Sequence, residues 1–259
     1  MKKTVTGWFI GILIAAMLSG CGARENGLNA EGVPGLAASQ PAVQEEKGEG
    51  VMTYAEYMAA KEETPVVVET YVQAVQSLWE GTVSIYSEDH EGGYFIYDMY
   101  CSEEEYARLI PGQKIKVSGT KSQWSGEIEI IDAVIEFEEG SYIAPALDVT
   151  QLLGKEELIQ YQNRFVRFED LTVEAADRET GAVYMYKWDG SGKEGDDLYF
   201  NVSKDGQTFT FTVESDLCSA DTEVYQAVKN LKIGDKVDLE GFLYWYDGVN
   251  PHVTSVTVR

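Results

Sequence analysis

Histidine and cysteine are scarce in this 259-residue chain, which has two histidines, His90 and His252, and three cysteines. Two histidines give little material for histidine-based catalysis or for a zinc site built from several histidines. After Cys21 only Cys101 and Cys218 remain, and two cysteines do not make the disulfide framework of a small secreted domain. We expect these two to occupy equivalent strand ends in separate domains, without a bond between them.

Basic residues are also few: the chain has 20 Lys and Arg against 44 Asp and Glu, a formal net charge of −24. Binding to nucleic acid depends on Lys and Arg side chains that neutralise phosphates, so this balance disfavours nucleic acid as a partner. It equally disfavours adsorption to anionic lipid. The same charge favours solubility.

No apolar run approaches the roughly 20 residues that a membrane-spanning helix needs. The longest, residues 8–18, follows Lys2 and Lys3, and this arrangement is typical of a signal peptide, here residues 1–20. It leads into Leu18-Ser19-Gly20-Cys21, which matches the lipobox of bacterial lipoproteins. We predict cleavage before Cys21 and lipid on its thiol, which would anchor the protein to the outer face of the cell membrane. Cleavage would remove two lysines and no acid, taking the charge from −24 to −26.

The remainder divides by composition into a polar segment and two longer segments with strand-like patterns. Residues 21–51 hold few large apolar side chains, so we expect a flexible tether. We predict a first domain over residues 52–140 and a second over residues 162–259. Residues 141–161 are predicted to form a linker containing one short helix.

Alternating apolar and polar residues predict five strands in the first domain. Thr53 and Glu56 have the spacing of a capping box, which predicts a short helix ahead of the first strand. Ser102 and the acidic residues after it predict the start of another helix. The expected order is strands at 66–75, 82–86 and 94–100, a helix at 102–109, and strands at 114–119 and 127–134. Three strands, a helix and two strands is the order of the OB-fold, a small Greek-key barrel.

The second domain repeats this order. The matching positions, by residue type and spacing, are Gly112, Gly119 and Gly126 with Gly234, Gly241 and Gly248, and Tyr100-Cys101-Ser102 with Leu217-Cys218-Ser219. Matches on both sides of the expected helix favour an internal duplication. We therefore predict a mainly β fold class: two tandem OB-fold-like five-stranded Greek-key barrels, each with a short helix between strands 3 and 4. The glycines are expected at turns, bulges or barrel corners.

The chain resembles a group of tandem OB-fold lipoproteins from gut-dwelling Gram-positive (Firmicutes) bacteria. The resemblance runs from the lipobox through both barrels and is carried by residues 52–57 (MTYAEY), 69–74 (ETYVQA), 97–104 (YDMYCSEE) and 123–133 (QWSGEIEIIDA). It implies the tandem OB-fold and no established catalytic residues.

OB-folds usually bind ligands on the face of strands 2 and 3, between the loop joining strands 1 and 2 and the loop joining strands 4 and 5. Aromatic side chains gather in these regions and can stack on bases or sugar rings. The ligand-binding candidates are Trp124, Trp245, Tyr94, Tyr97 and Tyr244. Trp124 and Trp245 lie near the fourth-to-fifth-strand loops and are the preferred pair. The alternative is that most of these rings belong to the barrel cores or are exposed strand residues.

The acidic segments offer weaker candidates. Residues 189–197 superficially resemble a calcium loop, but Lys193 occupies an expected ligand position and Phe200 stands where a glutamate belongs. A solvated loop is the preferred interpretation, and the sequence leaves open whether it holds a cation. Glu127 and Glu129 alternate on one strand face and are expected on its solvent side. We identify no catalytic residue, metal ligand or cofactor site, because no phosphate-binding loop, nucleophile elbow or metalloprotease motif occurs.

These observations favour a non-catalytic binding module at the cell surface for an extracellular ligand such as a glycan, a peptide or an envelope protein. The alternative is an accessory OB-fold protein for extracellular nucleic-acid binding or processing. An enzyme with an unfamiliar site at the barrel interface is a third hypothesis. Neither the identity of the ligand nor the oligomeric state follows from the sequence.

Overall fold

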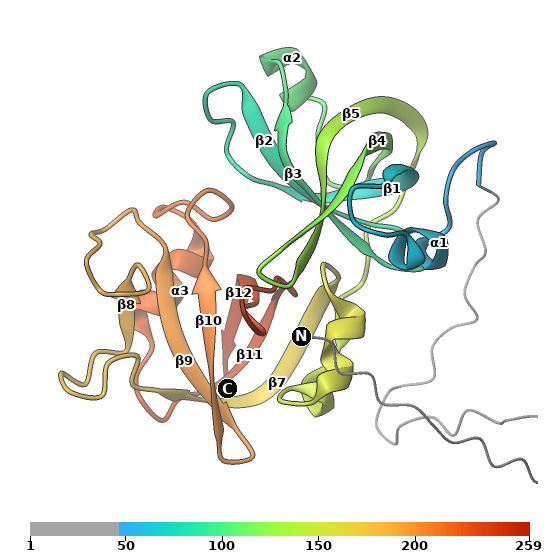
Figure 1. The fold of residues 1–259 in the computed structure, drawn as a ribbon. Coiled ribbons are helices and arrows are strands. Elements are labelled where there is room, and N and C mark those ends of the chain that lie inside the picture. The colour runs from blue at the N-terminus through green and yellow to red at the C-terminus, as the bar shows by residue number, and fades with distance from the viewer. Residues whose placement is uncertain (1–46) are drawn as a thin grey trace, which may run out of the picture. The chain divides into compact units, whose positions relative to one another are not determined.

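The computed structural model describes residues 47–259 (Figure 1). The predicted signal peptide, Cys21 and most of the tether lie outside the described residues. Within 47–259, none of the helices has the length and apolar character needed to cross a membrane.

The first domain is a closed barrel of five strands in the order β1-β2-β3-β5-β4 (Figure 1). Its elements are α1 (Tyr54–Ala59), β1 (Pro65–Val75), β2 (Thr82–Glu88), β3 (Gly93–Tyr100), α2 (Glu103–Tyr106), β4 (Gln113–Trp124) and β5 (Glu127–Ser141). The strands pair antiparallel except for β3 and β5, which run parallel. The predicted capping box of Thr53 and Glu56 at the start of α1 is confirmed. Ser102 caps α2 as predicted, and the structure adds a second capping box there between Ser102 and Glu105.

The second domain has the same connectivity. It contains β6 (Leu147–Asp148), β7 (Phe165–Glu174), β8 (Tyr184–Tyr186), β9 (Leu198–Lys204), β10 (Gln207–Val213), α3 (Glu223–Asn230), β11 (Lys236–Phe242) and β12 (His252–Val258). Its sheet order is β6-β7-β11-β12-β10-β9-β8, and an additional β7–β9 pairing joins the two ends of the five long strands. Here β10 and β12 run parallel, as β3 and β5 do in the first barrel, and the short β6 runs parallel to β7. The predicted fold class of two OB-fold-like barrels, each with a helix between strands 3 and 4, is confirmed.

The repeated glycines occupy equivalent places, as the duplication predicts. Gly119 in β4 and Gly241 in β11 each lie where the pairing with the last strand shifts register. At Gly119 a Cβ atom would lie 2.8 Å from the Ile131 carbonyl oxygen, and at Gly241 it would lie 2.8 Å from Val253 Cα. Each glycine therefore permits a close approach of two backbones at a barrel bulge.

The linker differs from the expected single helix. It holds two 3-10 helices, η1 (Thr150–Leu152) and η2 (Glu156–Tyr161), and neither has a side-chain cap. Gly154 separates them with a φ of +83°, a left-handed conformation that ends a helical run. The two sheets lie within residues 65–141 and 147–258, and the exact domain boundaries stay a prediction.

Side chains from the two barrels meet in a small buried cluster of Tyr86, Phe95 and Phe242. The rings of Tyr86 and Phe242 stack with their centroids 4.4 Å apart. Arg164 Nε lies 2.8 Å from Glu88 Oε1, and the side chain of Glu88 is almost fully buried. A buried ion pair of this kind opposes separation of the two surfaces, because separating it leaves an unpaired charge.

Glu127 and Glu129, expected on the solvent side of their strand, are both buried. The backbone N–H of Trp245 donates to Glu127 Oε2 over 2.8 Å, so residues of the second domain cover this face of β5. Cys101 and Cys218 are free and buried, and they follow β3 and β10, the third strands of their barrels.

Candidate functional site

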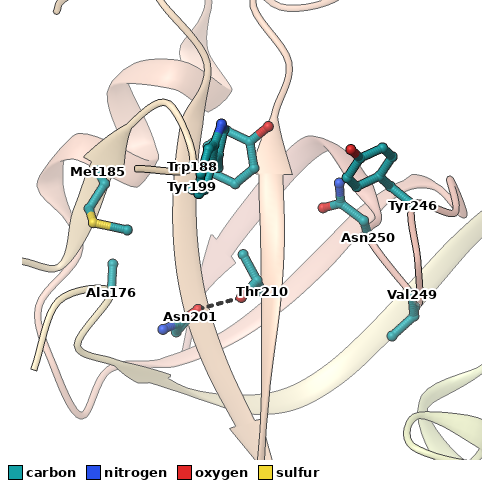
Figure 2. A pocket seen from close by; sticks show the side chains of 9 residues that line it. All are labelled: Ala176, Met185, Trp188, Tyr199, Asn201, Thr210, Tyr246, Val249 and Asn250. Carbon is teal, nitrogen blue, oxygen red and sulfur yellow. Dashed lines mark hydrogen bonds between the residues drawn. The ribbon is translucent and has the colours of Figure 1, made fainter. Parts of the chain in front are cut away.

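The outer face of the β9–β10 hairpin forms the floor of a cleft. Tyr199 and Asn201 of β9 stand directly opposite Thr212 and Thr210 of β10, so their side chains share one face of the sheet. Thr210 Oγ1 donates to Asn201 Oδ1 over 2.8 Å (Figure 2). In an OB-fold this face of strands 2 and 3 is the usual ligand surface.

Two long connections form the walls of this cleft. Ala176, Met185 and Trp188 come from the β7–β9 connection, and Tyr246, Val249 and Asn250 come from the β11–β12 connection (Figure 2). The cleft has two adjoining parts, with volumes of about 290 Å³ and about 490 Å³. Both parts are lined by Trp188, Tyr199, Tyr246 and Asn250. We call the combined surface the aromatic cleft.

Five Trp and Tyr rings line the aromatic cleft: Trp124, Trp188, Tyr199, Tyr244 and Tyr246. Trp124, at the end of β4, belongs to the first barrel and lies with its ring centroid 5.1 Å from that of Tyr246. Trp188 is 75% exposed and Trp124 is 54% exposed. Burying a ring of this size would stabilise the protein by roughly 2 kcal/mol or more. Exposure of both rings therefore favours a role in binding.

Two carboxylates lie in the larger part of the cleft. Asp197 Oδ1 accepts hydrogen bonds from the backbone N–H and the hydroxyl of Ser215, at 2.8 and 2.7 Å. Glu214 Oε2 accepts from Gln76 Nε2 of the first barrel over 2.9 Å. Burial, reinforced by the negative charge of Asp197, raises the pKa of Glu214 to about 7. Neighbouring groups therefore hold both carboxylates in place.

His252 also lines the larger part of the cleft. Its Nδ1 lies 2.9 Å from the Tyr86 hydroxyl, and its ring stacks on Tyr244 at a centroid distance of 4.4 Å. Burial lowers the pKa of His252 to about 3. The imidazole is therefore neutral at physiological pH and contributes hydrogen bonding without charge.

The structure places the five sequence-predicted residues in different surroundings. Trp124 and Tyr244 line the aromatic cleft. Trp245 is half-buried and faces a separate hollow beside η2, with its ring against Gly126. Tyr97 is exposed on β3 but does not line the cleft. Tyr94 is fully buried and its hydroxyl donates to Asp89, so the expectation of a ligand contact there is corrected: the ring belongs to the core of the first barrel.

Sequence reasoning missed Tyr199, Asp197, Glu214 and His252. The alternation in β9 could have identified Tyr199, because it lies between the buried residues Leu198 and Phe200. The other three depend on contacts between segments far apart in the chain.

In the acidic segment 189–197, carboxylate side chains accept hydrogen bonds from backbone N–H groups of the same segment. Asp189 Oδ1 accepts from the Ser191 N–H, and Asp196 Oδ2 accepts from the Lys193 N–H. Across residues 47–259, no three His, Cys, Asp or Glu side chains are grouped to hold a metal ion.

No protein-family model and no curated protein matches this chain. Among solved structures, the p204 HINb domain matches at 13% identity and a TM-score of 0.33, over 76% of this chain and 98% of that chain. A murine DNA-binding protein bound with double-stranded DNA matches at 15% identity and a TM-score of 0.34, over 75% and 98%. A Replication Protein A heterotrimer bound to single-stranded DNA matches at 10% identity and a TM-score of 0.34, over 78% of this chain and 51% of that chain. At such identities the likeness concerns the fold alone.

Two of these structures contain DNA, and the prediction that nucleic acid is a disfavoured partner is withdrawn. That prediction was wrong because it rested on the net charge of the whole chain. Net charge describes long-range attraction and repulsion, and it does not decide what one face of a barrel can bind.

Proposed function

We propose that this protein is a non-catalytic binding module that holds a ring-shaped ligand group in the aromatic cleft. The observation that carries this proposal is the convergence of five Trp and Tyr rings on the outer face of β9 and β10. Ring faces stack on sugars and on bases, and rigid aromatic side chains lose little conformational freedom on binding. The anchored carboxylates supply fixed hydrogen-bond acceptors beside the rings, and the neutral His252 adds a hydrogen-bonding group without charge.

Single-stranded nucleic acid is the second candidate ligand. Bases stack on exposed aromatic rings with little regard to sequence, and OB-fold faces of this kind bind single strands. Proteins with DNA bound are among the structures that share the fold. Glycans and oligonucleotides therefore belong in the same screen.

The test is an array of glycans and oligonucleotides probed with the full chain solubilised in mild detergent. Trp188→Ala should weaken capture of the bound ligand by about tenfold, since stacking contributes roughly 1–3 kcal/mol per ring. Trp79→Ala is the matched control, because Trp79 is 69% exposed and lies outside the cleft. Both variants should melt close to the natural protein, because both rings are mostly in water. Equal binding by all three proteins would contradict the proposal.

A further inference from the structure

The lining of the aromatic cleft contains carboxyl groups and no strongly basic side chain among the described residues. Asp197 and Glu214 both line it, and none of the described residues that line it is a lysine or an arginine. Asp216 lies nearby, since its charge and that of Asp197 both raise the pKa of Glu214 after burial, the larger cause. An anionic ligand group would meet these carboxylates without a compensating cation.

Asp197 is the carboxylate best placed to receive a ligand. Ser215 donates both of its hydrogen bonds to Oδ1 of Asp197. Within residues 47–259, the second oxygen, Oδ2, accepts no hydrogen bond, and Asp197 lines the cleft. A charged donor from a ligand would bind this oxygen strongly, because hydrogen bonds between ionised partners are stronger than those between neutral ones.

The aromatic rings favour the same charge. A cation within about 6 Å of an aromatic ring centroid is attracted by the negative face of the ring, and tryptophan is the best partner. Trp188 and Trp124 both line the part of the cleft that contains Asp197. The rings and the carboxylate therefore both favour an ammonium group.

The shape of the cleft favours a chain of rings over a single small cation. Its two parts share Trp188, Tyr199, Tyr246 and Asn250, so one continuous surface extends over both. Asn201, Thr210 and Asn250 supply amide and hydroxyl groups along this surface. Ring faces and neutral polar groups on one surface suit the apolar faces and hydroxyls of consecutive sugar units.

We propose that the ligand is an oligosaccharide with free amino groups, which places an ammonium beside Asp197 and a sugar ring on Trp188. This inference rests on the proposed function and specifies its ligand. Nucleic acid and lysine-rich peptides are the competing occupants, and the experiment distinguishes them.

The experiment compares two oligosaccharides of equal length by titration calorimetry: a glucosamine oligomer and its N-acetylated counterpart. The full chain in detergent should bind the free-amine oligomer about tenfold or more tightly, as expected for one charged hydrogen bond. Asp197→Asn should remove most of that preference. Asp205→Asn makes the same charge change in the exposed β9–β10 turn and should leave binding unchanged. Glu214→Gln provides a second cleft variant should Asp197→Asn fail to fold.

Other outcomes separate this inference from the proposed function. Equal affinity for the two oligomers would overturn the requirement for an amine while leaving the aromatic cleft as the binding site. An equal loss in Asp197→Asn and Asp205→Asn would reveal only general attraction to an acidic protein, and would overturn the inference. Tighter, Trp188-dependent binding of an oligonucleotide or a lysine peptide would overturn it in favour of that ligand. If Trp188→Ala changes the binding of no probe, the proposed function fails as well.

Discussion

Glu127 shows how one buried side chain depends on the residues around it. Its Oε2 accepts from the Trp245 N–H, while its Oε1 and the Oδ1 of Asn163 are both buried without a hydrogen-bond partner. Asn163 Nδ2 already donates to the Ile128 carbonyl oxygen. An unpaired buried oxygen costs most when it carries charge, so burial favours the protonated form of Glu127. Burial, with a smaller contribution from the charge of Glu129, raises the pKa of Glu127 to about 8.

This raised pKa predicts a pH-dependent stability. The folded protein holds the proton more tightly than the unfolded chain, whose glutamate keeps the ordinary value of 4.5. The stabilisation is therefore complete below pH 4.5 and is lost as the pH rises through about 8. Glu127→Gln should remove this loss, because an amide is neutral at every pH. Between pH 4.5 and about pH 8, the free energy of unfolding of the variant minus that of the natural protein should increase by about 1.4 kcal/mol per pH unit.

Urea unfolding at several pH values would measure this difference. Glu214 titrates in the same direction, with a pKa near 7, so only the difference between variant and natural protein isolates Glu127. Glu104→Gln, at an exposed position in α2, is the control and should show a constant difference. A constant difference for Glu127→Gln as well would mean that Glu127 stays ionised in the folded protein.

The pairing of strands 4 and 5 in each barrel depends on a glycine. In the second barrel, Gly241 lies at the bulge between β11 and β12, where the backbone of His252 and Val253 approaches its Cα. The same bulge occurs at Gly119 in the first barrel. The sequence spacing predicted these positions because a barrel corner recurs at the same place in each copy.

We predict that Gly241→Ala destabilises the protein by about 3 kcal/mol, since the new methyl group would push apart two paired backbones. Gly206→Ala is the control in the β9–β10 turn. Its φ is +80° but no atom lies within 4 Å of an added Cβ, so its cost should be about 1–2 kcal/mol. Denaturant unfolding of both variants measures the difference. Equal destabilisation would show that backbone conformation, and not close approach, makes glycine necessary at 241.

At the scale of the whole molecule, anchoring and ligand binding are assigned to different parts of the chain. We propose that Cys21 carries lipid and that the segment after it holds the barrels outside the membrane. The barrels present the cleft, and Trp124 of the first completes a surface built mainly from the second. The Arg164–Glu88 ion pair and the Gln76–Glu214 hydrogen bond link the two barrels, so Trp124 of the first stays beside the cleft of the second.

Cys21→Ala tests the anchor. The variant lacks the thiol that receives lipid, so it should leave the membrane fraction and lose metabolic labelling with fatty acid. Cys101→Ala is the control, since Cys101 is buried in the first barrel and should not affect either measurement. Unchanged membrane retention and labelling of Cys21→Ala would refute lipid anchoring.

Local sequence features by themselves determined the order of elements. Capping boxes, alternating strands and repeated glycines act over a few residues, so they predict strands and helices wherever the chain places them. The duplication then indicated the fold class, because few topologies are compatible with the same order of strands and helix in two consecutive copies. The lipobox prediction also depends only on neighbouring residues.

Tertiary structure alone decided which side chains are buried and which meet. Alternation placed Glu127 and Glu129 correctly on one face of a strand, but which face is covered depends on the other barrel. The same limit applies to Tyr94, whose ring enters the core, and to Trp124, whose ring meets Tyr246 more than 100 residues away. A period of two assigns residues to faces, and only packing between distant segments determines which face becomes core and which becomes a site.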